Sequence, residues 1–350
     1  MAVTIAGLLP AGVHAQGTVE ARAETTRTGY LMGTRFRVEL PAGVERRRAL
    51  AASEAAVAAL EGMESLLSTW RDDTPLSALN RAPAGVPHAV APLLLPLLDE
   101  ALAWSARTGG AFDPRVGPLV EAWDLRGGGR VPSAEELDRA RSAVGDRGIT
   151  LCGGMLIRHH PDAWLDTGGF GKGAALASAA RALRSMDVDD ALLDLGGQLL
   201  ALGSPHGGEG WAVSVAHPLH RDIPVRALRL RDASVATSGN SQRSLQAGGT
   251  RVGHLLDPRT GRPAADWGSV TVVSADPLEA DILSTALYVL GPEAGMALAL
   301  TLPDTGVLFL TPSGEGVDAR WNPAMERWLV APHPTGAVDL SNPTPTGNDP

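Results

Sequence analysis

The chain has 350 residues, of which 44% are hydrophobic and 20% are charged, so it can bury a sizeable core as one large domain or two subdomains. This composition excludes disorder throughout the chain. The formal net charge is −9 and no Lys/Arg cluster offsets it, so electrostatics gives little support to binding of nucleic acid or an anionic membrane. Cys152 is the only cysteine, which excludes an intrachain disulfide, a multi-cysteine zinc site and a CxxC redox pair.

The two ends of the chain differ from the rest. Residues 1–17 contain an apolar stretch of signal-peptide length that ends in Val13, His14 and Ala15, a cleavage-like site. The usual positive charge before it is absent, and the stretch is too short to span a bilayer. We predict a leader over residues 1–25, export to the periplasm or cell envelope, and no transmembrane helix in the mature chain. If the leader is not a signal, the protein is cytoplasmic. Residues 333–350 lack apolar periodicity and are predicted to be a disordered tail.

Residues 26–332 are predicted to form one domain in which strand and helix patterns mix without strict βαβ alternation, which favours an α+β fold. Apolar alternation predicts a strand over residues 30–40, and one apolar face predicts a helix around residues 57–67. Pro75 opens a short helix after Thr74, and residues 93–108 form a buried helix that stops at a glycine pair.

Glycines punctuate the second half, where loops usually carry functional sites. The expected elements are a capping box at Ser133 and Glu136, a hairpin turn at Gly153 and Gly154, strands over residues 163–165, 191–195 and 269–274, and helices over residues 172–186 and 277–290.

The first candidate site is Leu165-Asp-Thr-Gly-Gly-Phe-Gly-Lys172-Gly, a glycine-rich turn that opens a helix. Such a turn offers backbone N–H groups to a phosphate, and Lys172 adds a positive charge. The glycine spacing does not match a Walker A loop, and no Ser or Thr follows Lys172. A tight structural turn with an exposed lysine is the alternative interpretation.

The second candidate is the pair Asp281 and Thr285, four residues apart and therefore on one face of a helix. Magnesium takes oxygen ligands and commonly uses only one or two protein carboxylates together with substrate phosphates. An early-helix Asp that favours the helix dipole, with a half-buried Thr, is the alternative.

The third candidate is His254-Leu-Leu-Asp257-Pro-Arg-Thr-Gly261, which carries a histidine and an aspartate into a turn. A histidine near a carboxylate can take a proton from an attacking hydroxyl at neutral pH. The Asp-Pro-x-Thr-Gly segment is equally suited to forming a turn in which Asp257 bonds its own backbone.

In their order along the chain, these segments resemble the FAD:protein FMN transferase family, the ApbE-type flavin transferases. The matching segments are Met32-Gly33-Thr34, Ser68-Thr69-Trp70, Leu76 to Asn80, Gly110 to Pro114, Leu165 to Gly173, Leu195-Gly196-Gly197, Ala236 to Gly239, His254 to Gly261, and Ala280 to Ala286. The resemblance implies a single α+β domain of the T-fold-like type, with two β-sheet subdomains and FAD in a cleft between them.

The resemblance also implies roles for particular residues. It places Mg²⁺ on Asp281, Thr285 and the carbonyls of Ser284 and Gly169. It implies FAD contacts at Gly33, Thr34, Trp70, Asn80, Asp113, Lys172, Gly197, Thr237, Ser238 and His254. Gln198, the residues after Gly239, and Phe170-Gly171 depart from the family pattern. The first two departures leave details of the flavin or adenine contacts open.

The expected activity is magnesium-dependent transfer of FMN from FAD to a Thr or Ser of an acceptor flavoprotein that carries a Ser/Thr-Gly-Ala-Thr-like motif, with release of AMP. Lys172 would add positive charge, His254 is the candidate base, and Asp257 would orient it or share its task. A magnesium-dependent FAD pyrophosphatase and an exported, non-catalytic FAD-binding protein are the alternatives. A serine hydrolase is disfavoured because no G-x-S-x-G segment is found.

Overall fold

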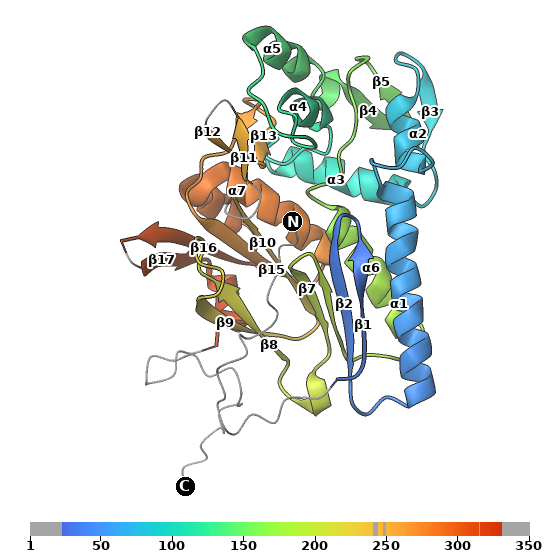
Figure 1. Ribbon diagram of the computed structural model, residues 1–350, viewed down its shortest axis with the longest axis vertical. Coiled ribbons are helices and arrows are strands. Elements are labelled where there is room, and N and C mark those ends of the chain that lie inside the picture. The colour runs from blue at the N-terminus through green and yellow to red at the C-terminus, as the bar shows by residue number, and fades with distance from the viewer. Residues whose placement is uncertain (1–22, 241–243, 248–249, 315, 331–350) are drawn as a thin grey trace.

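The computed structural model describes residues 23–240, 244–247, 250–314 and 316–330. The predicted tail and residues 1–22 of the predicted leader lie outside these ranges, so both stay predictions. Within the described residues, the chain forms one large sheet covered by long helices, with a smaller helical part at one end (Figure 1).

The large sheet has eight strands, and every neighbouring pair is antiparallel. In spatial order the strands are β1 (Ala23–Leu31), β2 (Thr34–Pro41), β6 (Ala191–Leu195), β7 (Gln198–Leu202), β10 (Ala233–Gly239), β15 (Ser269–Ser274), β16 (Gly306–Ser313) and β17 (Gly316–Trp321).

Both faces of the central strands are buried, because side chains alternate between two separate cores. In β16, Val307 and Phe309 belong to the main core, whereas Leu308 and Leu310 belong to a second core. The main core also contains side chains of α1 (Arg46–Leu67), α6 (Gly171–Arg184) and α7 (Pro277–Ala299). The second core is closed by the hairpin of β8 (Trp211–Ala216) and β9 (Pro224–Leu230).

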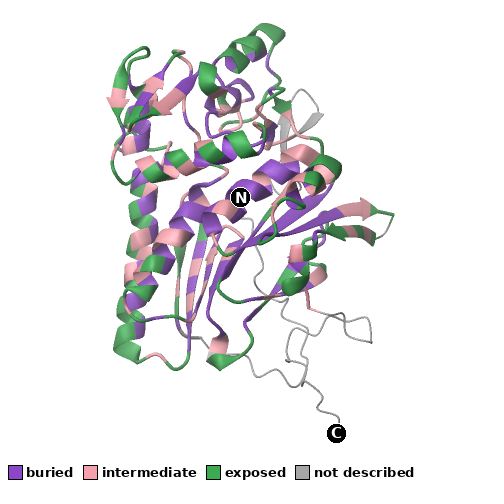
Figure 2. Cartoon of the chain, turned by 180° about the vertical axis from the view of Figure 1, so that it is seen from behind, coloured by how far each residue is buried: buried purple, intermediate pink, exposed green. Residues whose placement is uncertain are grey.

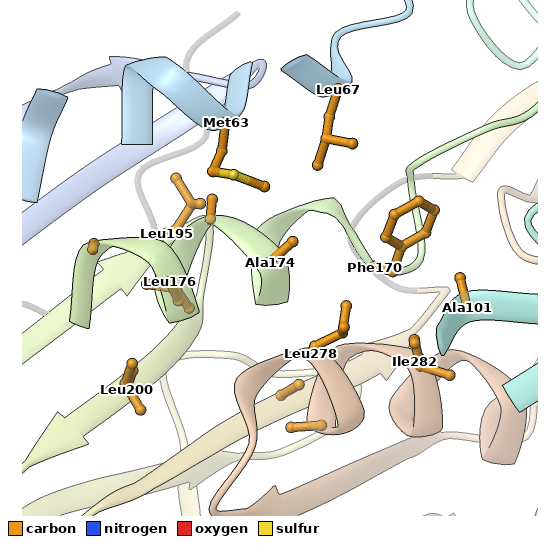
Figure 3. Packing of buried hydrophobic residues seen from close by; sticks show 14 of the residues in the cluster. Met63, Leu67, Ala101, Phe170, Ala174, Leu176, Leu195, Leu200, Leu278 and Ile282 are labelled. Carbon is orange, nitrogen blue, oxygen red and sulfur yellow. The ribbon is translucent and has the colours of Figure 1, made fainter. Parts of the chain in front are cut away.

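Helix α6 lies between α1 and α7 in the main core (Figure 3). Met63 and Leu67 of α1 pack over Ala174 of α6, and Leu278 and Ile282 of α7 lie on the opposite side. Figure 2 shows that buried residues concentrate where these helices meet the sheet. This packing brings the first turns of α6 and α7 together, and both turns carry predicted site residues.

The smaller part lies beyond the end of α1 (Figure 1). Its elements are α2 (Pro75–Arg81), β3 (Pro87–Ala89), α3 (Leu95–Arg107), α4 (Gly117–Ala122), α5 (Ala134–Ser142), β4 (Ile149–Cys152) and β5 (Met155–Arg158). Short strands β11 (Ser244–Ala247), β12 (Thr250–Gly253), β13 (Leu256–Asp257) and β14 (Arg262–Pro263) lie beside it. Leu256 packs with Leu119 and Trp123 in a third, small core.

Most local expectations are confirmed. The α+β class is correct, Thr74 caps α2 through its side chain, and Ser133 and Glu136 form the capping box. The predicted strand over residues 30–40 is instead a hairpin, because Met32 and Gly33 take positive φ angles of 51° and 72° and reverse the chain.

Two further elements differ from the prediction. The expected strand over residues 163–165 is wrong, because this segment makes no ladder and its Leu165 backbone bonds to the side chain of Asn80. Helix α7 runs to Ala299 but breaks at Gly291, where φ is +78°, so its straight part ends near the predicted residue 290.

Helix α7 is the one helix of the described residues that is long and apolar enough to cross a membrane, with a hydropathy of 1.4. The same properties are found in core helices. Here 44% of its most apolar window is buried, and its Ile282 and Leu283 belong to the main core. These properties are therefore weak evidence for a membrane span.

Candidate functional site

The first turns of α6 and α7 are in direct contact at Gly173. A Cβ atom on Gly173 would lie 2.2 Å from the carbonyl oxygen of Pro277 and 2.7 Å from Leu278 Cα, so the approach requires glycine at this position. The contact lets the Gly173 N–H donate to Asp281 Oδ2 at 3.0 Å. Lys172 Nζ donates to the other oxygen, Oδ1, at 2.7 Å. The Asp281 carboxylate, 3% exposed, therefore has a backbone donor and a cationic partner.

Thr285 lies one turn after Asp281 on α7 and borders the glycine-rich loop. A Cβ atom on Gly169 would be 3.2 Å from Thr285 Oγ1 and 3.0 Å from the ring of Phe112. The Ser284 hydroxyl is buried, donates to the Asp281 carbonyl at 2.9 Å, and lies 2.9 Å from Ser238 Oγ. The structure thus brings the four predicted metal residues to one place.

These residues fit a hard cation such as Mg²⁺. They offer carboxylate, hydroxyl and carbonyl oxygens, which are the ligands that magnesium prefers. The Lys172 ammonium on Asp281 shows that this carboxylate accepts a cationic partner. No cluster of three or more His, Cys, Asp or Glu suited to a metal occurs among the described residues, so a zinc-type site does not compete in that part of the chain.

Two further predicted segments meet at the end of β6. A Cβ atom on Gly196 would lie 2.8 Å from Thr34 Oγ1, which places the turn at Gly33 and Thr34 beside the turn at Gly196 and Gly197. The Gly197 N–H donates to Asp194 Oδ1 at 2.9 Å. Burial raises the pKa of Asp194, although this hydrogen bond and the charge of Arg37 oppose the shift.

Thr237 and Ser238 lie at the end of β10, which pairs with β7, the strand next to β6. Thr237 Oγ1 lies 2.8 Å from the hydroxyl of Thr271 on β15, and Thr237 is itself exposed. Ser238 reaches Ser284 on α7. Of the two predicted contacts on β10, Ser238 is therefore linked to α7 and Thr237 to β15, each through a pair of hydroxyl groups.

Asn80 holds the glycine-rich loop rather than presenting an open amide. Asn80 Nδ2 donates to the Leu165 carbonyl at 2.9 Å, and the Leu165 N–H donates to Asn80 Oδ1 at 2.8 Å. The next residue, Asp166, accepts a hydrogen bond from the Gly168 N–H at 2.7 Å. An FAD contact of Asn80 stays a prediction, while the geometry gives this residue a positioning role.

Asp113 is likewise engaged by the protein. It accepts hydrogen bonds from the Arg115 N, Nε and Nη2 atoms at 2.8 Å and from Ser105 Oγ at 3.0 Å. Only 6% of its side chain and 9% of that of Arg115 are exposed. Its predicted FAD contact remains a prediction, and the structure shows a buried ion pair that stabilises the chain around α3 and α4.

His254 lies half-buried between β12 and β13, two residues before Leu256 of the third core. The turn after it is held by Asp257, whose carbonyl accepts from the Gly261 N–H at 2.8 Å. Both carboxylate oxygens of Asp257 bond Arg259, at 2.8 and 3.0 Å. Trp123 Nε1 donates to the Gly261 carbonyl at 2.8 Å. These contacts favour a turn-forming role for Asp257.

Arg126 is a residue of this region that the sequence analysis did not single out. Its guanidinium bonds Asp166 Oδ2 at 2.7 Å and lies 4.9 Å from the ring centre of Trp70, a predicted FAD contact that is 72% exposed. Arg126 follows α4 in a turn and belongs to no local motif, so no sequence signal points to it.

The fold is α+β, and the site places a glycine-rich turn and Lys172 beside the oxygen atoms of Asp281 and Thr285, an arrangement that suits a phosphate-bearing ligand and a hard cation. The family model described as "ApbE family" matches residues 32–309. The chain therefore belongs to the ApbE family, which confirms the resemblance predicted from its motifs.

Curated relatives agree with this membership. The chain is 32% identical over 320 residues to the FAD:protein FMN transferase of Treponema pallidum, covering 86% of this chain and 88% of the relative. It is 29% identical over 316 residues to the protein of that name in Escherichia coli K12, covering 88% and 90%. These names describe a transferase, which is the class of enzyme predicted from the sequence.

Solved structures show the same fold. The flavin transferase ApbE of Vibrio cholerae superposes with a TM-score of 0.78 at 28% identity, covering 88% of this chain and 100% of that one. The flavinyl transferase ApbE of Pseudomonas stutzeri gives a TM-score of 0.76 at 29% identity, covering 89% and 97%. The predicted fold class is therefore confirmed over most of the chain.

Proposed function

We propose that this chain is a magnesium-dependent FAD:protein FMN transferase that moves FMN from FAD to a Thr or Ser of an acceptor flavoprotein and releases AMP. Its flavin transferase relatives support the flavin part of this proposal. The observation that carries the magnesium part is the buried Asp281 carboxylate, with Thr285 one turn along α7 and the Gly169 backbone beside it.

The residues of the chain have separable roles in this proposal. Asp281, Thr285 and the carbonyls of Gly169 and Ser284 would hold Mg²⁺, which when bound neutralises charge on a pyrophosphate. The half-buried Lys172 places a second positive charge 2.7 Å from the Asp281 carboxylate, where it can stabilise charge that develops on the departing AMP.

The transfer step exchanges one phosphorus–oxygen bond for another. The acceptor hydroxyl oxygen forms a bond to the FMN phosphorus, and the bond from that phosphorus to the AMP oxygen breaks. An imidazole nitrogen of His254 takes the proton of the hydroxyl. Positioning contributes more than this base, since a metaphosphate-like transition state demands little of the nucleophile. Asp257 is bound to Arg259, so it supports His254 mainly through the shape of the turn.

A magnesium-dependent FAD pyrophosphatase would use the same residues with water as the acceptor. A non-catalytic FAD-binding protein would need neither the cation nor a base. An acceptor assay therefore separates the three functions.

The test is the intact mass of a small acceptor domain with a Ser/Thr-Gly-Ala-Thr-like motif after incubation with this protein, FAD and Mg²⁺. A chelator and an acceptor whose Thr is replaced by Ala are the controls. A chelator-sensitive mass gain of one FMN on the intact acceptor supports the transferase. Free FMN and AMP without a mass gain would identify a pyrophosphatase, and unchanged FAD would identify a binder.

We further propose that the protein acts in the periplasm or cell envelope, on the basis of the apolar, cleavage-like residues 1–17. Fractionation of cells that produce the full chain, with a variant lacking residues 1–22 as the control so that β1 stays intact, tests this location. The mass of the exported protein would reveal whether the leader is removed.

A further inference from the structure

The guanidinium of Arg126 lies between two indole rings, 4.9 Å from the ring centre of Trp70 and 4.5 Å from that of Trp164. Only 28% of its side chain is exposed. Arginine makes cation–π contacts more often than lysine, and only its planar guanidinium can stack on an aromatic face while it donates several hydrogen bonds. The turn that presents Arg126 is shaped by Asp124, which has a φ of +49° and accepts a hydrogen bond from the Gly128 N–H at 3.0 Å.

The same guanidinium joins two segments that are distant in the sequence. Its Nη1 donates to the Thr69 carbonyl at 3.1 Å, and its Nη2 donates to Thr69 Oγ1 at 2.5 Å and to Asp166 Oδ2 at 2.7 Å. The other oxygen of Asp166 accepts the Gly168 N–H. Arg126 therefore connects the Thr69–Trp70 segment to the start of the glycine-rich loop.

Each connected segment contains a residue with a role in the proposed function: Trp70 as an FAD contact and Gly169 as a Mg²⁺ ligand. Trp70 follows Thr69 directly and exposes 72% of its surface. Gly169 follows Gly168 directly and borders Thr285. A change at Arg126 would therefore alter the position of the Trp70 ring relative to the Gly169 carbonyl. The hydrogen bonds of Arg126 go to Thr69 and Asp166 rather than to Gly169 or Thr285.

We propose that Arg126 is a positioning residue for FAD and Mg²⁺. Through Thr69 it sets the place of Trp70, and through Asp166 it sets the place of the Gly169 carbonyl. This inference rests on the proposed function. In this inference Arg126 touches neither FAD nor Mg²⁺ and instead orients Trp70 and the Gly169 carbonyl, which would touch them.

The test compares the full-length variants Arg126→Met, Arg126→Lys, Asp166→Asn and the double variant Arg126→Met/Asp166→Asn with the parent protein. Arg130→Met is the matched control, because Arg130 lies four residues after Arg126, just beyond the same turn, and pairs with the exposed Glu136 at 2.8 Å. The measurements are the Kd of FAD from flavin fluorescence without acceptor, the KM of FAD, the half-saturating Mg²⁺ concentration, kcat and the thermal midpoint.

We expect Arg126→Met to raise the Kd and KM of FAD and the half-saturating Mg²⁺ concentration by about tenfold or more, as loss of a supporting residue does at metal sites. The kcat at saturation should fall by less than about threefold. Arg126→Lys should restore little, because an ammonium cannot stack and bond both partners. Asp166→Asn should add little to Arg126→Met, because the two residues act together.

Other results would overturn the inference. A lower thermal midpoint and a smaller active fraction, with Kd, KM and the Mg²⁺ requirement unchanged, would show a merely structural role. Additive effects of Arg126→Met and Asp166→Asn would show that Arg126 does not act through Asp166. If the parent protein neither transfers FMN nor cleaves FAD, the proposed function fails, while the Kd of FAD in the variants still tests Arg126.

Discussion

Gly173 and Asp281 are joined by a hydrogen bond of 3.0 Å, from the Gly173 N–H to Asp281 Oδ2, where α6 and α7 are in contact. A single Cβ atom on Gly173 would come within 2.2 Å of the Pro277 carbonyl oxygen. The orientation of the buried carboxylate therefore depends on the absence of a side chain in the facing helix.

Gly173→Ala should separate the two helix ends and weaken the hold on Asp281. Overpacking of this kind costs about 1–3 kcal/mol of unfolding free energy, and the Mg²⁺ requirement should rise. The control is Gly62→Ala, on the exposed face of α1 with no atom within 4 Å of an added Cβ. It should stabilise the protein by about 0.5–1 kcal/mol, because alanine favours helix. Urea unfolding gives the free energy of unfolding of both variants. Equal changes in Gly173→Ala and Gly62→Ala would refute the claim that the helix contact requires glycine at position 173.

Asp281→Ala should abolish magnesium-dependent transfer while the fold remains intact. The change removes the carboxylate of the proposed metal site, and it leaves the Lys172 ammonium without its partner at 2.7 Å. Asp281→Asn keeps the shape and removes the charge, so it should also lose activity. Activity across a Mg²⁺ titration and circular dichroism are the measurements. Full activity at ordinary Mg²⁺ concentration would remove Asp281 from the ligands.

His254→Ala should slow transfer more than it weakens FAD binding. The rate should fall by about 10²-fold, the low end of the range for loss of a general base, because a metaphosphate-like transition state demands little of the nucleophile. The Kd of FAD should change only a few fold, because the imidazole acts mainly on the acceptor hydroxyl. Single-turnover transfer rates and FAD titrations give the two quantities. Equal losses in both would make His254 a binding residue.

Asp113→Asn should act chiefly on stability. Asp113 and Arg115 form a buried ion pair, and Arg115 has a second partner in Asp146. Removing the charge of Asp113 should therefore cost less than the roughly 3–5 kcal/mol lost when a buried charge is left with no partner. The matched surface variant is Asp72→Asn, since the side chain of Asp72 is 99% exposed in its ion pair with Arg81, and it should have little effect. Urea unfolding gives the stabilities. A large rise in the Kd of FAD at unchanged stability would instead support the direct FAD contact.

Local patterns were sufficient for much of the fold. The strand predicted over residues 191–195 has the same limits in β6, and the strand over residues 269–274 has those of β15. Thr74 and Asp276 cap their helices through side-chain oxygens. These features depend on residues a few positions apart, so the sequence shows them directly.

Contacts between residues far apart in the sequence explain why the strand predicted over residues 163–165 does not form. The segment over residues 163–165 has no strand partner because Asn80, 85 positions away from Leu165, bonds both backbone groups of that residue. The same limit applies to Arg126, whose partners Thr69 and Asp166 are 57 and 40 positions away.

The sequence by itself determined the α+β class, the family, and the pairing of Asp281 with Thr285 on one helical face, because periodicity and motif order are local properties of the chain. Only the tertiary structure decided that Lys172 pairs with Asp281, that Asp113 and Asn80 are held by neighbouring protein groups, and that Arg126 joins two loops. These contacts depend on how α6, α7 and the loops pack together, and that packing follows from the shape of the whole core.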